Sequence, residues 1–158
     1  MRILAIDYGE RRIGLAVCDE DETLASAYGT RERIGNKRDA VMLLDIVRGL
    51  GVQGIVIGLP RALNEAEQGT SEEKVRSFAR KLEDTLRASN REIPLYFWDE
   101  RFSTREALGQ MRVAGISQRQ GRNDNGSGGV DARAAAIILE GFLDSRRQEN
   151  KTESTLEL

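Results

Sequence analysis

Histidine is absent from this chain of 158 residues. Without an imidazole, the protein has no histidine general base, no Ser-His-Asp or Cys-His nucleophile system, and few of the ways in which proteins hold zinc. Any catalytic chemistry must therefore be carried by other side chains.

Cysteine occurs once, as Cys18, so no disulfide can form within the chain and a reducing setting is expected. Cys18 lies in an apolar, strand-like segment, where a small buried side chain is the ordinary interpretation. The first residues, MRILAID, have the pattern of a strand and leave no place for a signal peptide. No apolar run approaches the roughly 18 residues of a membrane span. We therefore expect a cytoplasmic protein with no membrane partner.

A strong excess of positive charge is also missing. Lys and Arg number 24 against 26 Asp and Glu, which gives a formal net charge of −2. Binding to nucleic acid would then depend on local patches or on metal ions. Aromatic residues are only 5 % of the chain and form no ladder on which a single strand would stack its bases. These features single out neither RNA nor DNA.

The apolar patterns predict one α/β domain over residues 1–147 and a flexible polar tail over 148–158. Short connections between the first three strands favour an antiparallel meander, and two parallel strands separated by a helix are expected to follow. The result is a five-stranded mixed sheet with helices on both faces. The strands are expected at 2–7, 12–20, 24–34, 54–60 and 93–98.

Apolar residues at helical spacing predict the helices. The first is expected over 36–51, with a stripe that includes Val41, Leu44 and Val47. Segments 61–70 and 115–129 are polar or glycine-rich and are expected to be loops. A capping box at 103–106 opens a further helix, and the last helix is expected over 130–147. The helix before the fifth strand has its stripe at Val75, Phe78, Ala79, Leu82 and Leu86.

Acidic residues lie where several of these elements begin or end. Asp7 ends the first strand, Asp99 and Glu100 follow the fifth, and Asp131 lies on the apolar stripe of the last helix. Sites in open sheets form beyond the carboxyl ends of parallel strands, so we expect these acids at one edge. Because side chains alternate along a strand, Asp99 and Glu100 should point to opposite faces, and the pattern alone does not decide which reaches the site.

Carboxylates from three distant segments would repel one another unless a cation joined them. Mg²⁺ and Mn²⁺ prefer oxygen ligands, and two such ions about 3.5–4 Å apart can activate water and stabilise the leaving oxygen in phosphodiester hydrolysis. Each acid also has a structural interpretation. Asp7 would end a strand in a turn, Asp131 would cap its helix, and Asp99 and Glu100 would pair with Arg101 at the surface.

Four segments in this order and spacing resemble the YqgF/RuvX family of pre-16S rRNA nucleases, also described as Holliday junction resolvases. They are IDYGERRIGLAV at 6–17, VIGLP at 56–60, WDERFST at 98–104 and VDARAAAIIL at 130–139. The resemblance extends from Arg2 to about Asp144. It implies an RNase H-like fold and a nuclease of ribosome biogenesis that processes the 5′ end of pre-16S rRNA, with junction DNA as the alternative substrate.

Carried over by position, the family's catalytic and metal-binding acids fall on Asp7, Glu100 and Asp131, which favours Glu100 over Asp99. The resemblance implies Mg²⁺ or Mn²⁺, with two ions, as cofactor. The partners would be pre-16S rRNA or branched DNA and possible ribosome-assembly proteins, for a monomer or a homodimer.

The residues expected to contact the nucleic acid are Gly9, Arg12, Arg101 and Arg133. Gly9 and Gly14 match the family's first motif, and Gly9 would permit a tight turn beside the metals. Arg12 would contact a phosphate or form an exposed ion pair. Where relatives carry a basic stretch, this chain has GRNDNGSGG at 121–129. Compensating charge would come from Arg112, Arg119, Arg122 and Arg133, unless these are ordinary surface arginines.

Two other classes of function stay open. The Asp-x-Gly turn also occurs in actin-like and sugar-kinase folds, where it faces phosphates. Those proteins need two such domains, and this chain has neither that length nor a Gly-x-x-x-x-Gly-Lys-[Ser/Thr] loop. A non-catalytic module that binds nucleic acid would keep the same fold.

Overall fold

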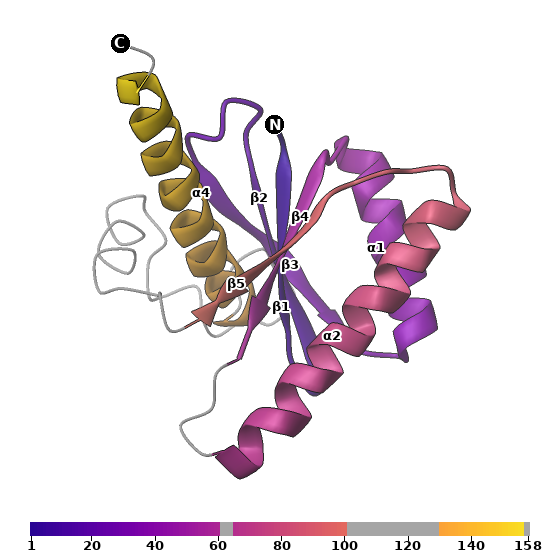
Figure 1. Cartoon of the computed structure of the whole chain (residues 1–158). Coiled ribbons are helices and arrows are strands. Elements are labelled where there is room, and N and C mark those ends of the chain that lie inside the picture. Colours follow the sequence, from indigo (N-terminus) through magenta and orange to yellow (C-terminus); the bar gives the residue numbers. More distant parts are fainter. Residues whose placement is uncertain (61–64, 101–129, 157–158) are drawn as a thin grey trace.

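The computed structural model of the chain describes residues 1–60, 65–100 and 130–156. A sheet of five strands lies at its centre, and helices cover both faces (Figure 1). The strands are β1, Ile3–Tyr8; β2, Arg12–Cys18; β3, Ala25–Glu32; β4, Gly54–Leu59; and β5, Leu95–Asp99. They are adjacent in the order β3-β2-β1-β4-β5.

Strand β1 lies in the middle of the sheet. It pairs antiparallel with β2 and parallel with β4, while β2 pairs antiparallel with β3 and β4 pairs parallel with β5. The predicted meander followed by two parallel strands is therefore confirmed. Ile3, Leu4, Ala5 and Ile6 are all fully buried, because helices cover the middle of the sheet on both sides.

The helices of the described ranges are α1, Asn36–Leu50; α2, Glu65–Ala88; and α4, Val130–Leu156. Helices α1 and α2 lie on one face and α4 lies on the other (Figure 1). Alternation along β1 supplies both layers, since Leu4 and Ile6 pack with α1 and α2, whereas Ile3 and Ala5 pack with α4. No helix in these ranges has the length and apolar character needed to cross a membrane.

Helix α1 ends where Gly51 adopts the left-handed conformation, with φ 65°, and its N–H donates to the carbonyl of Val47. Val41, which we expected on the buried stripe, is 47 % exposed. A helix turns by about 100° per residue, so a stripe centred on Ala40, Leu43 and Leu44 directs Val41 to solvent. The stripe predicted for α2 is buried in full: Val75, Phe78, Ala79, Leu82 and Leu86.

Two helices are longer than predicted. Helix α2 begins at Glu65, inside the segment 61–70 that we expected to be a loop, and α4 continues to Leu156 rather than ending at Arg147. Residues 148–156 are thus helical where a polar tail was expected. Both extensions contain Glu, Gln or Lys, which favour helix, and the Thr152 hydroxyl donates to the carbonyl of Gln148 at 3.0 Å. The helix expected to open at 103–106 and the loop at 115–129 lie outside the described residues.

Candidate active site

Asp7 lies near the end of β1 on the face that α4 covers, since it follows Ile3 and Ala5 at alternate positions. Its carboxyl is partly buried. This burial, the nearby charges of Glu100 and Asp131, and a hydrogen bond with Glu100 raise the pKa of Asp7 from 3.8 to about 7. Near neutral pH this carboxyl therefore holds a proton for much of the time, which an ordinary aspartate does not.

Glu100 follows the last residue of β5 and reaches back to Asp7. Burial raises its pKa, the hydrogen bond with Asp7 lowers it, and the charge of neighbouring Asp99 raises it again. Asp7 and Glu100, from now on the carboxylate pair, thus share one proton across the width of β4. The prediction that Glu100 rather than Asp99 approaches Asp7 agrees with this geometry.

Gly58 makes the carboxylate pair possible. It lies in β4, the strand between β1 and β5. A β-carbon at this position would lie 2.5 Å from Cδ1 of Ile138 and 2.8 Å from Oε1 of Glu100. Any larger residue would therefore force the Glu100 carboxylate and the end of the Ile138 side chain to move from these positions. We did not single out Gly58 from the sequence, although a glycine inside the apolar run IVIGLP is a signal of close approach.

Asp131 enters the site because the first turn of α4 packs directly onto β2. A β-carbon at Gly14 would lie only 1.9 Å from the carbonyl oxygen of Asp131. Gly14 is also the residue paired with Asp7 in the β1–β2 ladder. The close approach therefore brings the start of α4 next to Asp7, and the buried Ala132, Ala135 and Ala136 continue the contact along the helix.

Arg12 faces Asp131 in this structure. Its Nε lies 3.6 Å from Oδ2 of Asp131, and the two side chains are 51 % and 36 % exposed. This is the ion pair that the sequence offered as one of two roles for Arg12. Such an exposed pair contributes little to stability, so Asp131 is held only loosely by its partner.

The three predicted acids lie at one edge of the sheet but do not form one ligand set. The carboxylate pair is joined by a hydrogen bond, whereas Asp131 acts on Asp7 through its charge and faces Arg12. Among the residues described, no three Asp, Glu, His or Cys side chains lie close enough to hold a metal ion. The carboxylate pair itself suits Mg²⁺ or Mn²⁺, because these ions prefer carboxylate oxygens and displace the proton that such groups share.

The turn after Asp7 is fixed from the opposite face of the sheet. Gly9 N–H donates to the carbonyl of Arg12 at 2.9 Å, and a β-carbon on Gly9 would lie 2.7 Å from that oxygen, which confirms the expected tight turn. Nη1 of Arg33 donates to the carbonyls of Gly9 and Glu10 at 3.4 and 3.1 Å. The guanidinium lies over the ring of Tyr8, 4.2 Å from its centroid. We did not identify Arg33 from the sequence, because its contacts join β1 to a distant segment.

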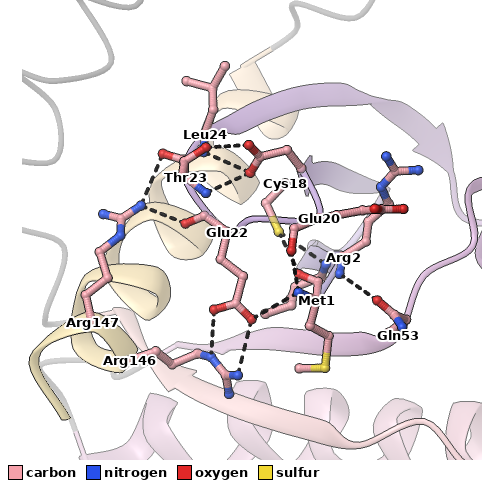
Figure 2. Close-up of polar contacts among 12 residues, drawn as sticks. Met1, Arg2, Cys18, Glu20, Glu22, Thr23, Leu24, Gln53, Arg146 and Arg147 are labelled. Atoms are coloured by element: carbon pink, nitrogen blue, oxygen red, sulfur yellow. Dashed lines mark hydrogen bonds and ion pairs between the residues drawn. The ribbon is translucent and has the colours of Figure 1, made fainter. Parts of the chain in front are cut away.

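The other half of α4 is tied to the turn between β2 and β3 (Figure 2). Nη2 of Arg146 lies 3.2 Å from Oε1 of Glu22, and Nη2 of Arg147 donates to the carbonyl of Glu22 at 2.8 Å. The amino group of Met1 lies 3.7 Å from the same Glu22 carboxylate. Helix α4 is therefore held at two places, by Gly14 at its first turn and by Glu22 near Arg146 in its second half.

The structure does not describe several of the arginines that we expected near the nucleic acid. Arg101, Arg112, Arg119 and Arg122 lie outside the described residues, as does the segment 121–129. Arg133 lies partly buried on α4, two residues after Asp131. Cys18 is buried as expected, and its Sγ accepts the N–H of Ile3 at 3.2 Å.

Comparison with known proteins matches nearly the whole chain. The model of the RuvX family, described as Holliday junction resolvase, matches residues 1–145. A protein of Syntrophus aciditrophicus (strain SB) named "Putative pre-16S rRNA nuclease" is 42 % identical over 149 residues, which cover 94 % of this chain and 92 % of that protein. One of the same name from Anaeromyxobacter dehalogenans (strain 2CP-C) is 40 % identical over 146 residues, covering 92 % and 98 %.

Solved structures show the same fold. The complex of Thermus thermophilus RuvC with a Holliday junction substrate aligns with a TM-score of 0.61 at 15 % identity, covering 94 % of this chain and 96 % of that one. The yeast mitochondrial Holliday junction resolvase Ydc2 aligns with a TM-score of 0.60 at 11 % identity, covering 99 % and 84 %. At these identities the likeness shows the fold alone, which is the RNase H-like fold that we predicted. By its match over residues 1–145 and by relatives identical at 40 % and more, the chain belongs to the RuvX family.

Proposed function

We propose that this chain is a nuclease that hydrolyses phosphodiester bonds with Mg²⁺ or Mn²⁺ held by Asp7, Glu100 and Asp131. The observation that carries the proposal is the carboxylate pair. Asp7 in β1 and Glu100, directly after β5, converge in a partly buried place, and the pKa of Asp7 is raised to about 7. Such an arrangement costs stability, which is typical of sites kept for function.

Each residue has a defined part in this proposal. When bound, two ions would activate the attacking water and stabilise the leaving oxygen. Asp7 would lose its shared proton and give a carboxylate oxygen as ligand, together with Glu100. Asp131 would turn from Arg12 toward the carboxylate pair to complete the ligand set. Arg12, released from Asp131, would then be available to a phosphate oxygen of the substrate.

The proposed substrate is the 5′ end of pre-16S rRNA, processed in the cytoplasm, alone or with ribosome-assembly proteins. The support is the name of the relatives, which align over nine-tenths or more of both chains. A second candidate is branched DNA, which the family's description and the substrate bound to Thermus thermophilus RuvC favour. A non-catalytic module that binds nucleic acid or a nucleotide is the alternative of another class.

The test uses two labelled substrates, a pre-16S rRNA leader fragment and a four-way DNA junction, each with Mn²⁺, with Mg²⁺ and with EDTA. Asp7→Asn should abolish cleavage. Asp45→Asn is the matched control, because Asp45 is exposed on α1 and takes no part in the site. Cleavage by Asp7→Asn at the wild-type rate would rule out the proposed site. No cleavage by the wild type, despite measurable Mn²⁺ binding, would favour the non-catalytic module.

A further inference from the structure

A cavity of about 150 Å³ lies at the same edge of the sheet as the carboxylate pair, but on the face that α1 and α2 cover. Tyr8 and Gly9, in its wall, follow Asp7 directly along the chain, and Pro60 follows the last residue of β4. The cavity is therefore separated from the carboxylate pair only by the edge of the sheet. Its lining residues are Tyr8, Gly9, Glu10, Arg33, Pro60, Ser71, Lys74 and Val75.

Arg33 is a fixed hydrogen-bond donor in this wall. One side of its guanidinium stacks on Tyr8, and its nitrogens bond the turn carbonyls and Oδ1 of Asn36. The fully buried Asp39 lies 3.7 Å from Nε and offsets part of the positive charge. Arg33 thus lines the cavity with a rigid guanidinium whose positive charge is partly offset.

Lys74 supplies the uncompensated charge. It is exposed on α2, and within the described part of the chain its ammonium has no carboxylate partner. Two of the three arginines of α2 differ in this respect, since Arg76 pairs with Glu72 at 2.9 Å and Arg87 with Glu83 at 2.6 Å. Ser71 lies three residues before Lys74, on the same side of the helix, and adds a hydroxyl to the wall.

We propose that this cavity binds a backbone phosphate of the nucleic-acid substrate, within a few nucleotides of the bond that is cut. The inference rests on the proposed nuclease function. Guanidinium, ammonium and hydroxyl donors are the groups that hold phosphates in protein–nucleic acid complexes. Glu10, which also lines the cavity, opposes an anion. With Asp39 balancing Arg33, Lys74 is the residue on which phosphate affinity depends.

The test measures binding without cleavage, on an Asp7→Asn background with EDTA, for the DNA junction and the RNA leader. Each phosphate contact contributes about 0.7 for a single strand, or about 0.9 for a duplex, to the slope of log Kd against log salt. Lys74→Ala should lower the slope by that amount and weaken binding about five- to eightfold at about 0.1 M salt. Lys81→Ala is the matched control, an exposed lysine of α2 that lies outside the cavity.

Two further measurements sharpen the result. Glu10→Gln should tighten binding, because among the described lining residues Glu10 is the one with a negative charge. A single uncharged methylphosphonate can replace each phosphate of the DNA junction in turn. At the position that contacts Lys74, the replacement should weaken binding by Lys81→Ala but not by Lys74→Ala, which has already lost this contact. Arg33 is left unchanged, because it also fixes the turn after Asp7.

The outcomes separate the two proposals. If the nucleic acid binds and the slope for Lys74→Ala equals that for Lys81→Ala, the phosphate site is wrong and the nuclease proposal stands. If neither probe binds and the wild type cleaves neither, both proposals fall.

Discussion

Asp7 lowers the stability of the metal-free protein at neutral and alkaline pH. Its pKa is 3.8 in ordinary surroundings and about 7 in the fold. Between these values the folded protein keeps a proton that the unfolded chain has lost, so the free energy of unfolding falls as pH rises. The loss begins near pH 4 and is complete once the pH is well above 7. A bound divalent ion would reverse the effect, since it stabilises the deprotonated carboxylate.

Asp7→Asn should therefore stabilise the metal-free protein at about pH 8, by ~1–3 kcal/mol in the free energy of unfolding. Near pH 4.5 the gain should vanish, because the wild-type carboxyl is already neutral there. Urea unfolding in EDTA at both pH values measures the difference. Asp45→Asn, on the solvent side of α1, should show no such pH dependence. A variant Asp7→Asn that is less stable than the wild type at pH 8 would contradict the assigned pKa.

Gly58 decides whether Glu100 meets Asp7. In Gly58→Ala the new β-carbon would collide with Ile138 and with the Glu100 carboxylate, at 2.5 and 2.8 Å. We expect a loss of ~1–3 kcal/mol of stability from overpacking, and Mn²⁺ affinity at least about tenfold weaker. Calorimetric titration and urea unfolding would measure both.

Gly54→Ala is the control for Gly58→Ala, because it lies in the same strand and a β-carbon there meets first the flexible end of Met1, at 3.1 Å. It should keep the wild-type affinity for Mn²⁺. Equal affinities for the two variants would mean that Glu100 does not depend on the space above Gly58.

At the scale of secondary-structure elements, the position of α4 sets the place of Asp131. Gly14 lets the first turn of the helix rest on β2, and Glu22 holds the other half through Arg146 and Arg147. The helix has no freedom to shift along the sheet without breaking one of these contacts. Asp131 is therefore presented from a rigid element, although its side chain is only loosely paired.

Among the glycines that the structure describes, Gly14 is the one at which a change to alanine should be most damaging. Its β-carbon would lie 1.9 Å from a backbone oxygen of Asp131, so α4 itself must move. We expect a loss of ~3 kcal/mol or more in the free energy of unfolding, measured with urea. Gly29→Ala in β3 is the comparison, since its nearest neighbour is the flexible Nη1 of Arg31 at 3.1 Å. Similar stability of the two variants would show that α4 does not pack as closely as described.

Helices and strands were predicted well where the apolar pattern within one segment is enough to show which side chains are buried. Residues 3–6 are a continuous apolar run, and the apolar residues from Val75 to Leu86 recur at helical spacing. Both sets are buried as expected. The prediction that Val41 is buried was wrong. More than one set of apolar residues in α1 has helical spacing, and the packing of α1 against the sheet determines which set is buried. The start of α2 at Glu65 was missed because helix propensity and loop composition compete in that segment.

The candidate site was less accessible to the sequence alone. The carboxyl ends of the predicted strands placed Asp7 and either Asp99 or Glu100 at one edge, and only the family resemblance favoured Glu100. Gly58 and Arg33 act through residues far away in the sequence, Ile138 and Tyr8 among them. Such contacts depend on how the layers pack, and no single segment carries their signal.

At the scale of the whole molecule, the site must overcome an unfavourable charge. The chain has a net charge of −2, and three acids stand where a polyanion would have to approach. Divalent ions would turn this edge from repulsive to attractive, and Lys74 on the opposite face would add a fixed contact. Metal binding should thus strengthen substrate binding and be required for cleavage, while the contact at Lys74 does not need the metal.

The most direct test of this account is calorimetric titration of the protein with Mn²⁺ in buffers of different ionisation enthalpy, at about pH 6 and about pH 8. We predict that wild type and Asp45→Asn bind Mn²⁺ with release of about one proton at pH 6 and almost none at pH 8, because Asp7 must lose its proton first. Asp7→Asn should bind far more weakly. Equal Mn²⁺ affinity for Asp7→Asn and wild type, or equal proton release at both pH values, would contradict a metal site at the carboxylate pair.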